Sequence, residues 1–328
     1  MITVLVTAIG SLAADIVIKN LKREGYQVIG SDIYPKEWIV DAYSVDRFFQ
    51  VPLAADSTAY LKALIEICTE NKVNYLIPLT DVEIDVLNNY RNLFDDISTK
   101  ICISSDKTIE ICRDKRKTAQ YLRQTSSIKR IPTLSASQIT INTDFNIGFP
   151  MIAKPYNGRS SNGIQRIRTT QELDVFLDSK IADGYIIQPL ITGKVVTVDV
   201  IRQTDGKKII AIPRLENLRT ANGLGTSVHV FHDQALQEEC CLLADHLEIN
   251  GCVNFEFIKT GEGCYYFLEC NPRFSGGVEF SCMAGYDLIS NHIRCFMGEP
   301  IDELGSYRDC YMARKYEETI TAYEKEHE

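Results

Sequence analysis

Several features that would place this 328-residue chain in a specialised class are missing from its sequence. No apolar run approaches the roughly 20 residues that a helix needs to span a bilayer. Positive charge is scarce, because 35 lysines and arginines stand against 44 aspartates and glutamates, for a net charge of −9. Such a chain lacks the basic surface on which non-specific nucleic-acid and anionic-membrane binding depend. We therefore expect neither nucleic acid nor membrane as a partner.

The sequence also lacks a basic segment ahead of its first apolar run, residues 2–6, so this run predicts a β-strand and not a signal peptide. The 11 cysteines form an odd set without C-x-x-C spacing, which fits neither a disulfide framework nor a zinc site. Cys68, Cys102 and Cys252 stand inside apolar segments, where free cysteine behaves as a small hydrophobic residue. We expect reduced cysteines and a cytoplasmic location.

The N-terminal third alternates strand and helix patterns, which predicts a parallel sheet. The first strand, residues 2–6, is followed by a small-residue turn, a helical pattern and a second strand over residues 27–31. Asp56 is placed to cap another helix, and residues 75–79 predict a further buried strand. These elements together predict a small Rossmann-like unit.

A dinucleotide site is the first alternative for such a unit. Gly10 and Asp32 match two positions of the nicotinamide-binding pattern G-x-G-x-x-G with its following acid. Ala8 and Ala13 stand where the first and last glycines belong, so the pattern is incomplete. A nicotinamide-dependent oxidoreductase stays open as an alternative, although a Rossmann-like unit without that cofactor fits the residues better.

The pattern changes from about residue 106. Residues 112–125 predict a basic helix, and residues 149–155 predict a strand that carries Lys154 near its end. A loop rich in glycine and serine follows at residues 156–163. A lysine at a strand end, next to a loop rich in backbone donors, is typical of a phosphate-binding site. Residues 188–191 offer backbone groups and an apolar wall, which suit the edge of an adenine ring.

The strongest chemical signal is a predicted hairpin near the C-terminus. Two β-rich runs, residues 252–258 and 264–271, flank a turn with two glycines. If the loop is residues 260–263, Glu256 lies opposite Phe267. Side chains alternate between faces along a strand, so Glu269 then lies diagonally across from Glu256.

This register predicts one face that carries Glu256, Phe267, Glu269 and Asn271. Two carboxylates and an amide oxygen are hard ligands that suit Mg²⁺. Arg273, two residues further on, can form a forked contact with a phosphate. A register change of one residue would separate the two acids, so the structure can test this prediction.

These motifs, in this order, resemble the ATP-grasp superfamily, in particular the branch similar to the large subunit of carbamoyl-phosphate synthase. The resemblance covers nearly the whole chain, including residues 75–83 in the N-terminal unit and residues 275–277 after the hairpin. It implies an α/β fold in which a Rossmann-like pre-ATP-grasp domain precedes a two-lobed ATP-grasp fold with a mobile lid. The predicted boundaries are 1–108 for the pre-ATP-grasp domain, 109–187 for the N-terminal lobe with its lid, 188–316 for the C-terminal lobe and 317–328 for a charged tail, expected to be a solvated helix or a frayed end.

The resemblance also implies roles for single residues. Lys115 and Lys154 should contact the ATP phosphates, with residues 157–163 as the lid and residues 188–191 as the adenine-binding hinge. The full set expected to bind ATP is Lys115, Lys154, Gly158, Ser160, Ser161, Gly163, Gln188, Pro189, Leu190 and Ile191. The metal positions of the family, for Mg²⁺ or Mn²⁺, fall on Glu256, Glu269 and Asn271, and its phosphate-binding arginine falls on Arg273.

The activity implied by the resemblance is an ADP-forming ligase. A substrate carboxylate takes the γ-phosphoryl group of ATP, and an amine or a thiol then displaces phosphate from the acyl phosphate. Arg273 and Arg219 are the expected catalytic residues. Homodimers are common among such enzymes, so a second copy of the chain is a candidate partner.

Residues for substrate recognition are expected at the lobe junction. Asp81 and Glu83 follow a predicted strand, a common position for ligand contact in an open α/β sheet, and could bind an ammonium group. Acids at a helix N-terminus explain the same two residues equally well. Arg214, in the segment that also contains Arg219, could contact a phosphate or the substrate carboxylate.

The chain departs from the family pattern after the hinge. The acid that usually holds the ribose is replaced by residues 193–195, and Asp199 does not obviously take its place. The sequence is also far shorter than a duplicated carbamoyl-phosphate synthase, which argues against synthesis of carbamoyl phosphate. Two further alternatives stay open: a kinase that phosphorylates a small molecule and stops there, and a non-catalytic nucleotide-binding module.

Overall fold

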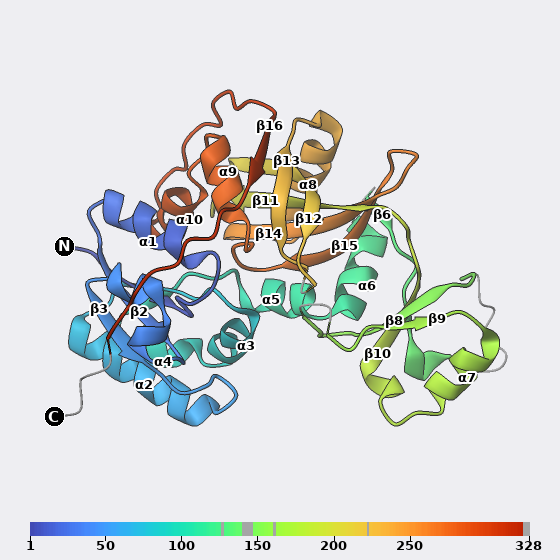
Figure 1. Ribbon diagram of the computed structural model, residues 1–328, viewed down its shortest axis with the longest axis horizontal. Coiled ribbons are helices and arrows are strands. Elements are labelled where there is room, and N and C mark those ends of the chain that lie inside the picture. The colour runs from blue at the N-terminus through green and yellow to red at the C-terminus, as the bar shows by residue number, and fades with distance from the viewer. Residues whose placement is uncertain (126–127, 140–146, 160–161, 222, 324–328) are drawn as a thin grey trace.

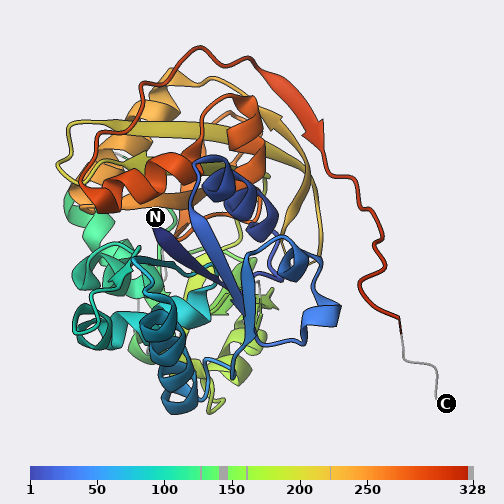
Figure 2. The ribbon, with the colours of Figure 1, turned by 90° about the vertical axis from the view of Figure 1, so that its left-hand side faces the viewer.

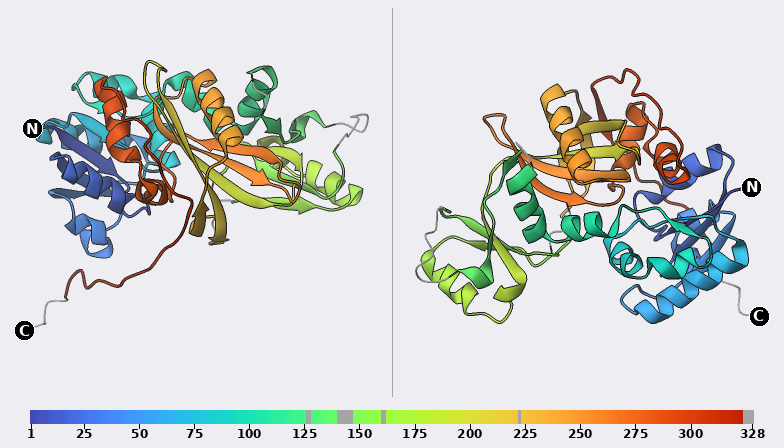
Figure 3. Two further views of the ribbon diagram at one scale, coloured as in Figure 1. Left: turned by 90° about the horizontal axis from the view of Figure 1, so that it is seen from above. Right: turned by 180° about the vertical axis from the view of Figure 1, so that it is seen from behind.

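The computed structural model describes residues 1–125, 128–139, 147–159, 162–221 and 223–323, and these residues form three β-sheets with their flanking helices. A five-stranded sheet lies at one end of the long axis, a four-stranded sheet lies at the other, and a seven-stranded sheet lies between them (Figures 1 and 3). Within this part of the chain no helix is long and apolar enough to cross a bilayer. The α/β fold class predicted from the sequence is confirmed.

The N-terminal unit is a parallel sheet with the strand order β3-β2-β1-β4-β5. Its chain order reverses direction between β1 and β4, which creates the crevice where open α/β sheets bind ligands. The Asp56 carboxylate accepts the Ala59 N–H at 3.1 Å, so the predicted cap of α2 is confirmed. The elements are β1 (Thr3–Thr7), α1 (Ala14–Arg23), β2 (Gln27–Asp32), β3 (Arg47–Gln50), α2 (Ser57–Asn71), β4 (Tyr75–Ile77), α3 (Asp81–Asn89), α4 (Arg91–Asp95) and β5 (Lys100–Ile101).

The seven-stranded sheet has the order β16-β13-β12-β11-β14-β15-β6, and it is antiparallel except where β6 runs parallel to β15. One face packs against α8, with Val196, Val198 and Val200 of β11 in that core. The other face is polar at its centre, which leaves it free to line a site. The elements are β6 (Lys129–Arg130), β11 (Lys194–Arg202), β12 (Ile209–Arg219), β13 (Gly225–Val230), α8 (Gln234–His246), β14 (Gly251–Lys259), β15 (Tyr265–Asn271) and β16 (Cys310–Ala313).

A second hydrophobic core joins the N-terminal unit to this sheet. Helix α10 (Leu288–Met297) lies against both α1 and β14 (Figure 2). Val17 of α1, Ile293 of α10 and Ile201 of β11 belong to one buried cluster, to which α9 (Val278–Ala284) also contributes. The two units are therefore held in a fixed relation by shared apolar packing.

The four-stranded antiparallel sheet has the order β7-β10-β8-β9 and forms the smaller lobe with α7. Thr169 accepts the Glu172 N–H at 3.2 Å, while the Glu172 carboxylate accepts the Arg168 N–H, so Thr169 and Glu172 cap the start of α7. The elements are β7 (Leu134–Ser135), β8 (Met151–Pro155), β9 (Gln165–Ile167), α7 (Thr170–Leu177) and β10 (Tyr185–Pro189), and short 3₁₀ helices lie at Lys36–Trp38, Val40–Tyr43, Ala136–Gln138 and Ala182–Gly184.

The single basic helix predicted over residues 112–125 is wrong, because two helices meet there. Helix α5 (Asp106–Arg113) ends at Asp114, which has an extended backbone, and α6 (Lys115–Thr125) begins directly after it. The Asp114 carboxylate accepts the Arg116 N–H at 2.8 Å. Aspartate competes for backbone donors in this way, so it interrupts one helix and starts the next.

The charged tail contains no helix over residues 317–323, so of the two predicted forms only the non-helical one agrees with the structure. After β16 the chain runs in extended form along the outside of the molecule (Figure 2). The Thr321 hydroxyl donates to the Glu37 carbonyl at 2.5 Å, which brings the tail to the N-terminal unit.

Candidate active site

The hairpin between β14 and β15 has a different register from the predicted one. Its loop is one residue longer, so Lys259 pairs with Tyr265. Leu268 forms a bulge between the pair Phe257–Phe267 and the pair Glu256–Glu269. Each change shifts the register by one residue, and a total shift of two restores the original face.

Glu256 and Glu269 therefore lie directly opposite each other rather than diagonally. Phe267 was predicted on their face and lies instead in the core with Phe255 and Phe257. The bulge is the physical cause, because the extra residue interrupts the alternation of side chains along β15. The predicted convergence of Glu256, Glu269 and Asn271 holds, by a different register.

The two acids of the pair, Glu256 and Glu269, have different electrostatic surroundings. Burial and the neighbouring Glu269 raise the pKa of Glu256 to about 7. Burial also acts on Glu269, but Lys115, with Nζ 3.1 Å from the carboxylate, and Lys154 lower its pKa below the ordinary value. Burial lowers the pKa of Lys154 to about 8. The pair is thus a half-buried acidic site that a further cation would stabilise.

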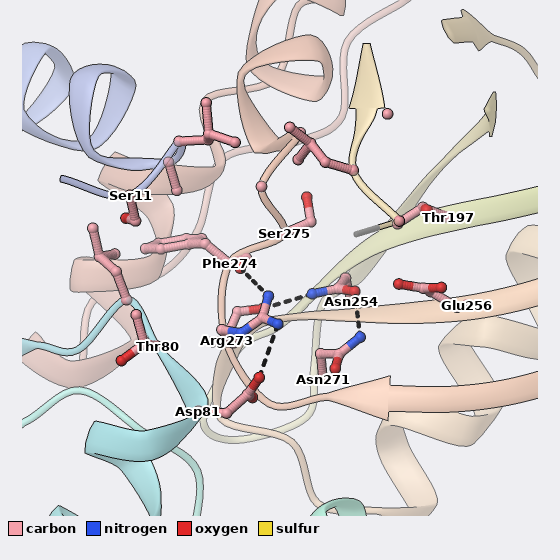
Figure 4. A pocket seen from close by; sticks show the side chains of 18 of the residues that line it. Ser11, Thr80, Asp81, Thr197, Asn254, Glu256, Asn271, Arg273, Phe274 and Ser275 are labelled. Carbon is pink, nitrogen blue, oxygen red and sulfur yellow. Dashed lines mark hydrogen bonds and ion pairs between the residues drawn. The ribbon is translucent and has the colours of Figure 1, made fainter. Parts of the chain in front are cut away.

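The donor set fits a hard divalent cation. Asn271 donates through Nδ2 to Asn254 Oδ1 at 3.1 Å, which leaves the Asn271 carbonyl oxygen for a ligand (Figure 4). No three His, Cys, Asp or Glu side chains come together in a metal-binding group anywhere in the described ranges. Two carboxylates and one amide leave coordination positions for water and phosphate oxygens, as Mg²⁺ prefers.

A cavity of about 180 Å³ lies between the smaller lobe and the hairpin. Most of the residues predicted to bind ATP line it: Lys115, Lys154, Gly158, Gln188, Pro189, Leu190 and Ile191. The Gln188 side chain donates to Thr133 Oγ1 at 2.8 Å, so it holds the hinge rather than offering a free amide. Leu268, missed from the sequence because the bulge was not foreseen, adds to the apolar wall.

The other residues predicted to bind ATP belong to the lid: Ser160, Ser161 and Gly163. Ser160 and Ser161 lie outside the described residues. Gly163 is described but is not among the lining residues, and its φ of +74° together with the nearby Pro155 ring explains why glycine stands there. Arg159, which the sequence did not single out, lines both this cavity and the next one.

A larger cavity of about 530 Å³ adjoins the first and shares Arg159, Arg219, Glu256 and Glu269 with it (Figure 4). Its floor consists of residues 10–13, which follow β1, and residues 79–82, which follow β4. These segments lie at the reversal of strand order, where the loops after parallel strands open a crevice. The cavity lies at the lobe junction, and substrate binding there stays a prediction.

Arg273 points into the larger cavity and is held by the N-terminal unit. Its Nη2 lies 3.0 Å from Asp81 Oδ2, and its Nη1 donates to the Phe274 carbonyl at 3.0 Å (Figure 4). Burial would raise the pKa of Asp81, but Arg273 and Arg113 together lower it. Asp81 thus lies in the cavity as predicted, yet its charge positions Arg273 and is not free for an ammonium group.

Glu83 does not reach the cavity, and its predicted role in substrate binding is corrected here. Its carboxylate accepts from the Tyr60 hydroxyl at 2.8 Å and the Thr80 hydroxyl at 2.7 Å. With Thr80 it forms the capping box of α3. The alternative explanation by a helix N-terminus therefore applies, because the third helical residue turns back toward the cap.

Arg214 lines the larger cavity but is almost completely enclosed. Its guanidinium group bonds to Asp199 and lies 3.3 Å from Glu216 Oε1, and it donates to Ser275 Oγ at 2.8 Å. Asp199 is fully buried in this cluster, so it cannot replace the missing ribose acid. Arg219 is more open, with Nη2 3.5 Å from Glu256.

Other residues of the site escaped the sequence analysis. Asn254 has its side chain on the face of Glu256, two positions away, and a complete reading of strand alternation would have found it. Ser11 follows the first strand, a position that the strand order marks. No local sequence pattern marked Glu216, because its place in the cavity wall depends on Gly225 of the neighbouring strand β13.

The nicotinamide alternative is not supported. Asp32 accepts the Gly10 N–H at 2.7 Å and the Tyr34 N–H at 3.1 Å. Both oxygens of the acid that would hold a ribose are therefore used to close the turn after β1.

Comparison with known proteins agrees with this geometry. The family described as "ATP-grasp in the biosynthetic pathway with Ter operon" matches residues 182–318, and the "PylC-like, N-terminal domain" matches residues 4–102. The match over residues 182–318 supports the resemblance to the ATP-grasp superfamily. It is similar to the carbamoyl phosphate synthase large chain of Methanospirillum hungatei, with 25% identity over 311 residues, which cover 88% of this chain and 28% of that protein.

A second relative is the carbamoyl phosphate synthase large chain of Caldanaerobacter subterraneus, 25% identical over 63% of this chain and 20% of that protein. The chain thus spans less than a third of the length of these curated relatives. The biotin carboxylase complex from Campylobacter jejuni has the same fold, with a TM-score of 0.77 and 18% identity over 92% of this chain and 72% of that one. The ADP complex of N5-carboxyaminoimidazole ribonucleotide synthetase has a TM-score of 0.72 and 16% identity, over 95% and 80%.

Proposed function

We propose that this protein is an ATP- and Mg²⁺-dependent, ADP-forming ligase that activates a carboxylate as an acyl phosphate and joins it to an amine. One observation carries the proposal: the paired acids Glu256 and Glu269 lie where two cavities meet. The smaller cavity has lysines and an apolar wall, as a nucleotide requires. The larger one has arginines and a ligand-binding crevice, as an anionic acceptor requires.

The residues of the smaller cavity would bind and orient ATP. Lys115 and Lys154 are close enough to the acid pair for their charges to lower the pKa of Glu269, so both cations lie beside the expected phosphate position. Glu256, Glu269 and Asn271 would hold Mg²⁺, which when bound offsets the negative charge of the β- and γ-phosphates. Residues 189–191 offer the ring edge of the base an apolar wall.

The residues of the larger cavity would place the acceptor. One oxygen of the substrate carboxylate attacks the γ-phosphorus, the bond to the β–γ bridging oxygen breaks, and ADP leaves with the electron pair. The amine then attacks the acyl carbon, loses a proton, and inorganic phosphate departs. Arg273, fixed by Asp81, would stabilise the negative charge on the intermediate. A thiol could replace the amine in the second step.

The kinase and the non-catalytic nucleotide-binding module are the alternatives to the ligase. A kinase would share the first step and release the phosphorylated acceptor. A non-catalytic nucleotide-binding module is motivated by residues 193–195, which stand where the family usually carries the acid that holds the ribose and contain no acid. The complete set of acids, lysines and Arg273 around one junction favours an enzyme over the module.

The test is a hydroxylamine-trap assay with Mg²⁺ and ATP against a panel of carboxylic acids and amino acids, in parallel with ADP release. Hydroxylamine converts an acyl phosphate into a hydroxamate whatever the natural amine is. We expect at least one acid to give hydroxamate, and Glu269→Gln to lower its rate by about 100-fold or more, because one metal-binding charge is lost.

The matched control is Glu262→Gln, which changes an exposed acid in the loop of the same hairpin and should leave the rate unchanged. A stable phosphorylated product without ligation to any amine would favour the kinase. ATP binding without hydroxamate or ADP from any acid would favour the module. A chain that binds no ATP would contradict the proposal altogether.

A further inference from the structure

The wall of the larger cavity on β12 contains a carboxylate that none of the steps above uses. The Glu216 side chain is 4% exposed, and its Oε1 accepts from Thr197 Oγ1 at 2.9 Å and from Arg214 Nε at 3.3 Å. Its other oxygen, Oε2, has no hydrogen-bond partner in the described part of the chain. A buried carboxylate oxygen without a donor is costly to maintain in a folded protein, so a donor from a ligand would be strongly favoured there.

The position of Oε2 depends on a missing side chain on the neighbouring strand. Gly225 of β13 also lines this cavity, and a Cβ atom at that position would lie only 1.5 Å from Oε2. Glycine therefore gives the carboxylate its place in the wall. Glu216 and Gly225 therefore define this part of the cavity wall together.

The neighbours of Glu216 leave its charge incompletely balanced. Arg214 is shared with the fully buried Asp199, so one guanidinium group faces two carboxylates. The other hydrogen-bond partners described for this cluster are the hydroxyl groups of Thr197, Ser275 and Ser281, which carry no charge. One excess negative charge remains, which calls for a cation from outside the chain.

A protonated amine suits this place better than a metal ion. Divalent cations take six or more oxygen ligands, whereas Oε2 of Glu216 and Oδ1 of Asp199 are the only carboxylate oxygens of this cluster without a hydrogen-bond partner in the described residues. An ammonium group needs few acceptors, and it supplies the N–H donor that Oε2 lacks.

Glu216 also lies on the same face of the sheet as the reacting centre. Arg214 and Glu256 both pair with Thr197, and Glu216 follows Arg214 by two residues, which keeps all four side chains on one face. Two strand spacings of about 4.8 Å separate β12 from β14, so the backbones are roughly 10 Å apart. One small molecule in the cavity can therefore reach from Glu216 toward Arg273 and the acid pair.

We propose that the larger cavity takes a substrate with both a carboxylate and a protonated amino group, and that Glu216 binds the ammonium group. An amino acid carries both groups. Its carboxylate would face Arg273 and the phosphate position while its ammonium group donates to Oε2 of Glu216. This inference rests on the proposed function for the direction of the carboxylate.

The test is calorimetric titration of the full chain, held with Mg²⁺ and a non-hydrolysable ATP analogue. The probes are amino acids paired with their 2-hydroxy acids: alanine with lactate, serine with glycerate, glutamate with 2-hydroxyglutarate and phenylalanine with phenyllactate. We expect at least one amino acid to bind about tenfold or more tightly than its hydroxy partner, since a charged hydrogen bond is lost in the latter. Glu216→Gln should reduce that ratio to about threefold or less, because glutamine keeps the shape and the Thr197 bond but removes the charge.

Gly225→Ala is a second variant, which displaces Oε2 without changing any charge and should also lower the ratio. Glu262→Gln is the control, and thermal unfolding reports whether each variant is folded. Equal binding of both members of every pair, an unchanged ratio in Glu216→Gln, or no binding of any amino acid would each overturn the inference. Hydroxamate from an acid without an amino group would leave the ligase standing and remove this inference, whereas Glu216-dependent binding without hydroxamate would do the reverse.

Discussion

At the scale of residues, the site depends on two carboxylates that are held face to face. Glu256 and Glu269 are cross-strand partners, and like charges directly opposite each other in a sheet are destabilising. The positive charges of Lys115 and Lys154 lower the pKa of Glu269. Glu256 has a pKa of about 7, so its charge changes near neutral pH. Sequence position alone would have given both acids the same behaviour, so the difference comes from their surroundings.

This difference predicts the pH dependence of stability in the metal-free protein. The pKa of Glu256 rises from 4.5 to about 7 on folding, so its stabilising contribution is complete below about 4.5 and is lost as the pH rises through about 7. We expect Mg²⁺ with a non-hydrolysable ATP analogue to raise the unfolding midpoint more at about pH 7.5 than at about pH 5.5, because protons compete with the cation for Glu256. Thermal unfolding at both pH values measures this, and an equal pH response in wild type and Glu256→Gln would contradict it.

At the scale of elements, the β14–β15 hairpin shows how a wrong register can still give the right face. The longer loop and the bulge at Leu268 each move the pairing by one residue, and the two effects combine to a shift of two. The neighbouring strand β11 begins beside Gly193, where the backbone of Lys259 comes very close. Position 193 therefore has no room for a side chain.

Gly193→Ala tests whether this position has room for a side chain. A Cβ atom there would lie 2.4 Å from the Lys259 carbonyl oxygen, which is backbone and cannot rotate away. We expect the free energy of unfolding to fall by about 1–3 kcal/mol through overpacking. Denaturant unfolding measures the change, and Gly261→Ala, whose Cβ would meet no atom within 4 Å, is the matched control and should change little. Similar stability of the two variants would show that the strand pair tolerates a side chain at 193.

At the scale of the whole molecule, the N-terminal unit and the seven-stranded sheet build the larger cavity together. They share one hydrophobic core, and the ion pair between Asp81 and Arg273 crosses from one to the other. The predicted boundaries at residues 108, 187 and 316 remain predictions. The shared core indicates that the first boundary does not separate two independently stable parts.

Asp81→Asn tests the role of this crossing contact. Asp81 is 4% exposed and faces both Arg273 and Arg113, so the variant leaves two guanidinium groups without their common partner. We expect a loss of about 1–3 kcal/mol in unfolding free energy and a slower hydroxamate reaction, because Arg273 is no longer held in place. Denaturant unfolding and initial rates measure the two effects.

The control for this variant is Asp15→Asn, which removes an exposed ion pair with Lys19 and should cost less than about 1 kcal/mol. A rate equal to that of the wild type in Asp81→Asn would show that Arg273 needs no support from the N-terminal unit.

The sequence by itself determined the alternation of strands and helices in the N-terminal unit, the cap at Asp56, and the acids, lysines and hinge around the smaller cavity. The strands, the cap and the hairpin acids follow from local patterns, because periodicity, caps and strand alternation involve residues close together in the chain. The choice of Lys115 came from the resemblance to the ATP-grasp superfamily. Only the tertiary structure decided the break at Asp114, the bulge at Leu268, the inward turn of Glu83 and the exposure of Glu216 to the larger cavity. Each of these depends on contacts or pairing that local residue patterns did not specify: a competing side-chain bond, a partner strand, a packed tyrosine and the Gly225 backbone against which the Glu216 carboxylate lies.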